Sequence, residues 1–229
     1  MLTLADELML LAIDECGDVA SSASLRLDHG IAGAHLLELA LADRVRIENG
    51  VVVVMDHAPT GDEPVDGVLR ALGAATTPRS AERWVGDLAG EARGPVLAAL
   101  HERGILDERK SRVLGLIPRT RHVESDPRPE REVRERLHEA VAGPGEADAR
   151  TVALASLVLA TDLLFEVFPA KDERALAKSR LADLSSGQVL RDALGDANEA
   201  LVTTLGMAVA TSAAASVAST GAAVVIAGL

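Results

Sequence analysis

The near absence of aromatic side chains is the feature that most restricts how this 229-residue chain folds. It contains two Phe, one Trp and no Tyr, whereas hydrophobic residues make up 48% of the chain. The core must therefore be built from Leu, Val and Ala, and an aliphatic core of this kind favours helices. Base-stacking sites for single-stranded nucleic acid need aromatic rings, so that class of binding site is excluded.

Apolar residues recur at helical spacing along most of the chain. Thr3 and Asp6 resemble a capping box, so the first helix is expected to begin there and to end at Gly17. Its expected range is 3–15, and a nearly all-apolar helix at 31–42 should be central. Further helices are predicted at 64–74, 78–89, 95–103, 130–142, 148–165, 171–184 and from 188 onward. In the helix at 78–89, Thr77 is expected to be the N-cap and Pro78 the first helical residue.

Two segments have the pattern of β-hairpins. In 44–54, β-branched and alternating residues flank Asn49-Gly50, which predicts a type I′ turn. A second hairpin is expected where 105–106 and 113–117 flank a charged turn at 107–111. The sequence therefore predicts a mainly α protein, a single globular helical domain with small β-hairpins.

Charge is distributed unevenly in this chain. Its net charge of −12 argues against a surface devoted wholly to DNA or to anionic lipid. One stretch nevertheless has five positive side chains and no acidic one, namely Arg109, Lys110, Arg112, Arg119 and Arg121. Aliphatic residues that include Leu114 and Leu116 lie among them, an arrangement that suits a membrane interface. In the alternative interpretation the aliphatic residues face inward and the arginines are simply solvated.

No strong catalytic, phosphate-binding or metal motif is present in the sequence. His35 and Glu38 share a helical face and have the spacing of two metal ligands, but a hydrogen-bonded histidine beside a carboxylate is the commoner arrangement. We therefore expect no enzyme, no metal and no cofactor. The order of helix, glycine and hairpin also resembles a winged helix, in which 95–103 would read DNA. That helix and its lead-in are poor in positive charge, so a nucleic-acid partner is not favoured.

The two ends of the chain bear on its compartment. The N-terminus lacks the features of a signal peptide and Cys16 is the single cysteine, so a cytoplasmic protein is expected. After Glu199 no charged residue follows. We expect residues 1–200 to form the helical domain and 201–229 a small-residue apolar helix or tail, with a membrane tail anchor as the alternative.

Six motifs, in order, resemble the Golgi phosphoprotein 3 family from the start of the chain to about residue 185. They are LTLADELMLLAID at 2–14, GIAGAHLLELALADRVRIE at 30–48, APTGDEPVDGVL at 58–69, SAERWVGDLAGE at 80–91, ERGIL at 102–106 and TVALASLVLATDLL-EVFP around 151–169. The resemblance, here to a bacterial-type member, implies a helical domain with one protruding hairpin. It also implies peripheral attachment to the cytosolic membrane face by binding of phosphatidylinositol 4-phosphate, with membrane insertion and self-association through the hairpin.

The resemblance also implies which residues hold the lipid headgroup. Family members use one Trp and three Arg, whose positions correspond here to Ala23, Ala32, Gly90 and Arg93, so only Arg93 matches. An anionic phospholipid or phosphoinositide headgroup is the expected partner, together with a second copy of the chain and an unidentified protein. The expected lipid-binding residues are Arg93, Arg109, Lys110, Arg112, Leu114, Leu116, Arg119 and Arg121. The alternative is a protein-interaction domain that forms homo-oligomers through the hairpin without binding lipid.

Overall fold

Two helices, α1 (Leu4–Leu11) and α2 (Leu27–Leu41), form the centre of this computed structural model, which describes residues 1–20, 26–113, 117–143, 147–185 and 203. All eight residues of α1 and eleven of the fifteen residues of α2 are buried. A helix at the surface of a domain buries only one stripe of its side chains, so these two are enclosed on nearly every side. The predicted central position of the second helix is confirmed.

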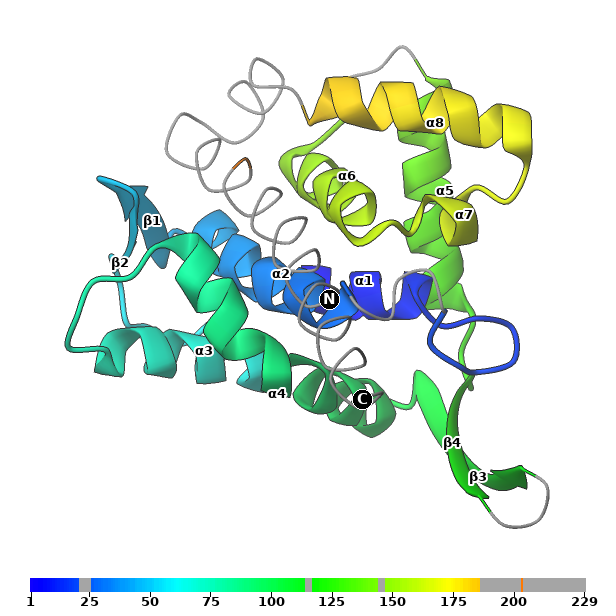
Figure 1. Cartoon of the computed structure of the whole chain (residues 1–229), viewed down its shortest axis with the longest axis horizontal. Helices are drawn as coiled ribbons and strands as arrows, with labels where there is room; N and C mark the ends of the chain where they lie inside the picture. The colour runs from blue at the N-terminus through cyan, green and yellow to red at the C-terminus, as the bar shows by residue number, and fades with distance from the viewer. Residues whose placement is uncertain (21–25, 114–116, 144–146, 186–202, 204–229) are drawn as a thin grey trace, which may run out of the picture.

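The other elements surround this centre on two sides (Figure 1). On one side lie α3 (Glu63–Ala74) and α4 (Ala81–Glu102), and on the other lie α5 (Arg128–Ala142), α6 (Ala149–Thr161), α7 (Leu164–Val167) and α8 (Lys171–Leu184). Four strands form two separate antiparallel hairpins, β1 (Val45–Glu48) with β2 (Val51–Val54) and β3 (Leu106–Val113) with β4 (Ile117–Glu124). The predicted mainly α fold with two small hairpins is confirmed.

The first helix begins as predicted but ends earlier. A complete capping box is present, because the N–H of Asp6 donates to Thr3 Oγ1 at 3.1 Å and the N–H of Thr3 donates to Asp6 Oδ2 at 2.8 Å. The expected extension to residue 15 is wrong. Ile13 pairs with Val19 in an isolated antiparallel bridge, so the chain has already reversed direction by Gly17, whose φ is +80°.

The β1–β2 hairpin has the predicted turn. Asn49 and Gly50 both have positive φ, at 51° and 80°, as a type I′ turn requires. Pairing of Glu48 with Val51 closes the hairpin directly around these two residues. A two-residue turn that requires two left-handed conformations is encoded locally, which is why the sequence predicts it well.

Helix α4 replaces the two shorter helices expected at 78–89 and 95–103. Its N-cap is Ser80, whose Oγ accepts the N–H of Arg83 at 3.2 Å, and not Thr77. The preceding residue is held to β2, because the carbonyl of Arg79 accepts the N–H of Val52 at 3.0 Å. The helix continues through Pro95 since its buried face runs without interruption from Ala81 to Leu100. Packing against α2 outweighs the hydrogen bond that proline removes.

The C-terminal helices follow the prediction with one break. The single helix expected at 148–165 is divided at Asp162, whose left-handed conformation (φ 64°) ends α6 before α7 begins. Helix α8 matches its predicted range of 171–184, and α5 begins two residues before its predicted start at 130. The helix expected from 188 onward and the division at 200 fall outside the described residues, apart from Thr203.

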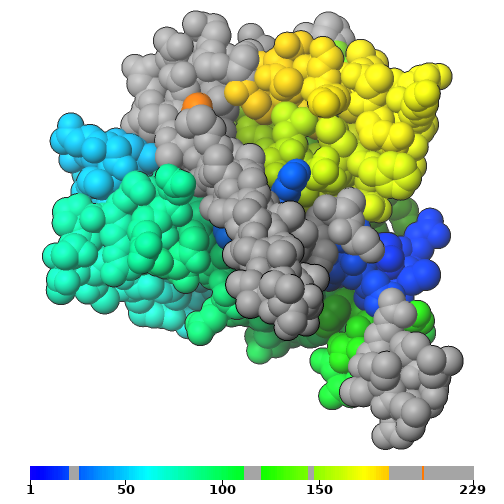
Figure 2. Space-filling view, in the orientation of Figure 1, coloured from blue at the N-terminus to red at the C-terminus, as the bar shows by residue number. Residues whose placement is uncertain are grey.

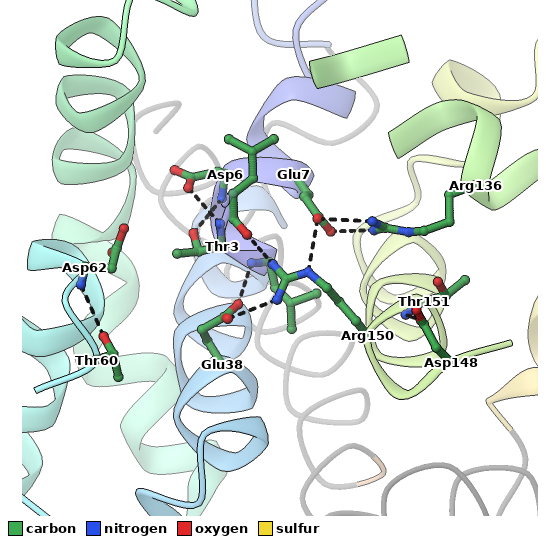
Figure 3. Close-up of polar contacts among 12 residues, drawn as sticks. Thr3, Asp6, Glu7, Glu38, Thr60, Asp62, Arg136, Asp148, Arg150 and Thr151 are labelled. Atoms are coloured by element: carbon green, nitrogen blue, oxygen red, sulfur yellow. Dashed lines mark hydrogen bonds and ion pairs between the residues drawn. The ribbon is translucent and has the colours of Figure 1, made fainter. Parts of the chain in front are cut away.

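A buried ion network joins four helices near the N-terminus (Figure 3). Glu7 of α1 is 3% exposed and binds Arg136 of α5 at 2.7 Å and Arg150 of α6 at 3.1 Å. Arg150 also donates to Glu38 of α2 at 3.0 Å, and the other oxygen of Glu38 accepts the N–H of Leu4 at 2.7 Å. Both carboxylate oxygens of Glu38 are therefore engaged within the protein, which leaves the suggested metal pair with His35 without support.

His35 makes stability depend on pH. It is 3% exposed on α2, and burial lowers the pKa of its imidazole to about 4, against the opposing charges of Asp62 and Asp6. Because this pKa lies below the unfolded value of 6.5, the neutral ring favours folding above pH 6.5, and that contribution is lost as the pH falls towards 4. The expected loss is about 3 kcal/mol of unfolding free energy.

Urea denaturation at pH 6.5 and pH 4 measures this loss. Between these two pH values, the unfolding free energy of the variant His35→Leu is expected to fall by about 3 kcal/mol less than that of the original protein. His57→Ala, at an exposed position, serves as the control and should behave as the original protein does. An equal fall in the original protein and in His35→Leu would show that His35 does not cause this loss of stability.

Within the ranges that the structure describes, no helix has both the length and the hydropathy needed to cross a membrane.

Candidate functional site

The β3–β4 hairpin projects from the helical body (Figures 1 and 2). Its strands pair from Leu106 with Glu124 to Val113 with Ile117. The charged turn expected at 107–111 is wrong, because these residues lie within β3. The predicted positive charges are therefore carried by two paired strands, and the connection between the strands consists of residues 114–116.

Two of the predicted arginines lie directly opposite one another in this hairpin. Arg109 of β3 pairs with Arg121 of β4, and cross-strand partners place their side chains on the same face. Like charges in this arrangement are destabilising unless an anion lies near them. Asp18 is one such group, at 3.6 Å from Arg121, whereas Arg109 is exposed. The face of the hairpin that carries Arg109 is thus suited to an external anion.

The other predicted hairpin residues are only partly described. Lys110 is exposed and lies 3.2 Å from Glu108. Arg112 and Arg119 belong to β3 and β4, with backbone partners Pro118 and Ser111, but nothing is described of their side chains. Leu114 and Leu116 lie outside the described residues.

The base of the hairpin is held to the body by backbone and side-chain contacts. The N–H of His122 donates to the carbonyl of Gly17 at 2.7 Å, and the N–H of Ser125 donates to the carbonyl of Ile105 at 2.9 Å. The ring of His122 stacks on His101, the last-turn histidine of α4, with centroids 5.3 Å apart. Sequence reasoning missed this pair, since only the register of β4 brings the two residues together.

Several charges act on His122. Burial lowers the pKa of its imidazole, and His101 and Arg93 lower it further, whereas Glu108 and Asp18 oppose this change. The charge of Arg93 therefore acts on this ring, although Arg93 is distant from β4 in the sequence. Its Nε donates to Asp28 of α2 at 2.9 Å, and its side chain is 27% exposed. Arg93 is therefore held to α2 through Asp28.

The positions that carry the other expected headgroup residues differ in what they can accommodate. Ala32 lies on α2 and is completely buried, so an arginine there would require repacking of the core. A side chain at Gly90 of α4 would meet open space, because no heavy atom lies within 4 Å of the point that its Cβ would occupy. Ala23 lies outside the described residues. The structure therefore explains why position 32 carries an alanine. Position 90 could carry a larger side chain without a clash.

An acidic cleft of about 850 Å³ lies at the hairpin base. Its lining includes His122, His138 and Arg134 and a larger number of carboxylates, namely Asp14, Glu15, Glu124, Glu130, Glu166 and Glu173. Burial raises the pKa of Glu124, and the neighbouring Glu130 raises it further. An anionic headgroup is disfavoured in such surroundings, so the basic face of the hairpin is the better candidate.

The helix at the hairpin base does not support the nucleic-acid alternative. The last turn of α4 leads to Arg103, which is bound by Asp6 at the start of α1 and by Asp62 at the start of α3. Arg103 therefore links three helices and is not directed towards a partner. The stretch 95–103 is also not a separate recognition helix, because it is the second half of α4.

The chain matches a known protein family. The family described as Golgi phosphoprotein 3 (GPP34) matches residues 4–201, which include the hairpin, Arg93 and the described helices.

Proposed function

This chain belongs to the Golgi phosphoprotein 3 family, and on that premise we propose that it is a peripheral membrane adaptor, without catalytic activity, that binds anionic phospholipid headgroups through the β3–β4 hairpin. The observation that carries the proposal is the pairing of Arg109 with Arg121 on a hairpin that projects from an acidic body. In the described part of the chain, Arg121 has Asp18 as its carboxylate partner and Arg109 has no ion pair, and lipid phosphates would supply further anions.

The magnitudes are consistent with binding despite a net charge of −12. Each basic side chain near an anionic membrane surface contributes about 1 kcal/mol. Charges of the acidic body are screened over a Debye length of about 8 Å at physiological salt, so a projecting basic element acts largely by its local charge. Five basic side chains from Arg109 to Arg121 are enough for reversible attachment.

The sequence between the strands adds an apolar component. Leu114, Gly115 and Leu116 connect β3 to β4, and Val113 and Ile117 flank them. Basic strands that lead to an apolar connection match the composition of elements that bind at the headgroup and acyl boundary. This composition supports contact with a bilayer more than contact with a free phosphate.

Specificity for one headgroup is not supported as strongly. Of the four headgroup positions that the family resemblance implies, only Arg93 keeps its residue, and it is already paired with Asp28. Each charge-assisted hydrogen bond contributes about 1.5–3 kcal/mol, so the loss of three such contacts removes most of the discrimination. We therefore propose that binding follows the negative charge of the surface rather than the identity of the headgroup.

Vesicle co-sedimentation at physiological salt tests this function. Vesicles of phosphatidylcholine alone are compared with vesicles that contain phosphatidylglycerol or phosphatidylinositol 4-phosphate at equal surface charge. Equal binding to both anionic compositions and none to the neutral one is expected. Selective binding that is lost in Arg93→Ala would indicate a specific pocket, and binding to none would favour the protein-interaction alternative.

Gly90 offers a way to restore a missing headgroup contact. In Gly90→Arg, the new side chain extends into open space beside the turn that carries Arg93, so it should bind phosphate without disturbing the core. We expect affinity for phosphatidylinositol 4-phosphate vesicles to rise about tenfold relative to phosphatidylglycerol vesicles. Gly90→Ala is the matched control, because it gains helix propensity but no charge. Equal affinities in both variants would contradict this placement of the headgroup.

A further inference from the structure

The two histidines at the base of the hairpin form a contact that depends on protonation. Nδ1 of His122 and Nε2 of His101 lie 3.3 Å apart, and their rings are inclined by only 25°. One ring belongs to β4 and the other to the last turn of α4. The contact therefore spans the junction between the hairpin and the helical body.

Only some protonation states are compatible with this contact. Two nitrogens at this distance form a hydrogen bond when one carries a proton and the other presents a lone pair. The contact survives when one of the rings becomes an imidazolium, because the facing nitrogen of the other ring still accepts. When both rings are charged, two N–H groups face one another and the contact is repulsive. The pair therefore accepts one additional proton without losing its geometry.

Charged groups of both signs face the pair. His122 is influenced by Glu108 of β3, by Asp18 in the segment between α1 and α2, and by Arg93 of α4. The acidic cleft that it lines adds Asp14, Glu15, Glu124, Glu130, Glu166 and Glu173 and the basic groups Arg134 and His138. Glu108 and Asp18 favour a proton on the pair, and Arg93 disfavours it. Burial is the largest influence and lowers the pKa of His122 in the absence of lipid, and an added surface of negative charge opposes this and favours the protonated form.

We propose that the His101–His122 pair is a proton-dependent element of the lipid-binding hairpin, which adds one positive charge at its base as the pH falls and so strengthens its attachment to anionic membranes. This inference rests on the proposed function of the hairpin and concerns its regulation. By linkage, a membrane that favours the protonated pair must bind more tightly when protons are more abundant. One added charge at the surface corresponds to about a fivefold gain in affinity.

Co-sedimentation with phosphatidylglycerol vesicles at pH 7.5 and pH 5.5 tests the proposal. The phosphodiester of this lipid does not titrate in that range, so its surface charge stays constant. We expect the ratio of affinities at pH 5.5 and pH 7.5 to be about fivefold larger in the original protein than in the double variant His101→Gln with His122→Gln. His57→Gln, at an exposed position outside the hairpin, controls for the general effect of losing a histidine.

The outcomes separate the two proposals. Absence of binding at both pH values contradicts the proposed function itself. Binding with the same pH response in the original protein and the double variant overturns only the role of the histidine pair.

Nuclear magnetic resonance of the imidazole nitrogens without lipid tests the coupling of the two rings independently of vesicle binding. Removal of the charge at position 101 by His101→Gln should let His122 titrate at a higher pH than in the original protein. An unchanged titration of His122 would show that the rings do not interact and would overturn the proposal.

Discussion

Replacement of Glu7 by alanine is expected to lower the free energy of unfolding by about 3–5 kcal/mol. The carboxylate is nearly inaccessible to solvent, and it holds the guanidinium groups of Arg136 and Arg150, whose side chains are 31% and 14% exposed. Without Glu7, these partly buried charges face one another with less compensation. The α1, α5 and α6 helices would also lose the group that joins them (Figure 3).

Urea denaturation of the variant measures this effect. Arg70→Ala is the matched control, because it breaks an exposed ion pair with Glu63 and should lower the unfolding free energy by less than about 1 kcal/mol. Equal effects of the two substitutions would show that the buried network does not stabilise the fold more than a surface pair does.

Reversal of charge at the paired arginines should remove membrane binding. In Arg109→Glu with Arg121→Glu, two positive charges are replaced by two negative ones at directly opposed positions of the hairpin. At about 1 kcal/mol per charge, the expected loss of affinity for anionic vesicles is about a thousandfold, which places binding below detection in co-sedimentation. Circular dichroism of the variant is expected to show unchanged helix content and serves as the check that it folds.

The control for this variant changes the same net charge elsewhere. Arg70→Glu with Arg83→Glu reverses two exposed arginines, with side chains 63% and 72% exposed, on α3 and α4 outside the hairpin. Only a small loss of binding is expected there, because these charges lie away from the proposed contact. A loss as large as in the hairpin variant would show that binding depends on net charge rather than on the hairpin.

Local signals in the sequence predict most of the fold. The capping box at Thr3 and the Asn49-Gly50 turn depend only on neighbouring residues, and both are present. The errors arise where distant contacts decide. Pro95 does not end α4 because the buried face of this helix continues across it, and Asp162 divides a helix that periodicity alone would extend. Neither effect is encoded within the segment concerned.

The candidate site is predictable in its composition but not in its geometry. The run of basic residues from Arg109 to Arg121 is visible in the sequence, whereas the pairing of these two residues depends on the strand register. The expected turn at 107–111 would have placed the charges at the tip. The contact of His101 with His122 joins a helix end to a strand, and no periodic pattern connects such positions.

A fluorescent label can identify which surface of the protein meets the bilayer. Cys16 is the single cysteine, so Cys16→Ser with Thr120→Cys allows an environment-sensitive fluorophore to be placed at an exposed position of β4. Cys16→Ser with Ser179→Cys places it on α8, which lies at the top of Figure 1, whereas the hairpin lies at the bottom.

Membrane binding through the hairpin predicts that phosphatidylglycerol vesicles shift the emission of the hairpin label to shorter wavelength and leave the α8 label unchanged. A shift of the α8 label alone, while the protein still sediments with vesicles, would contradict it.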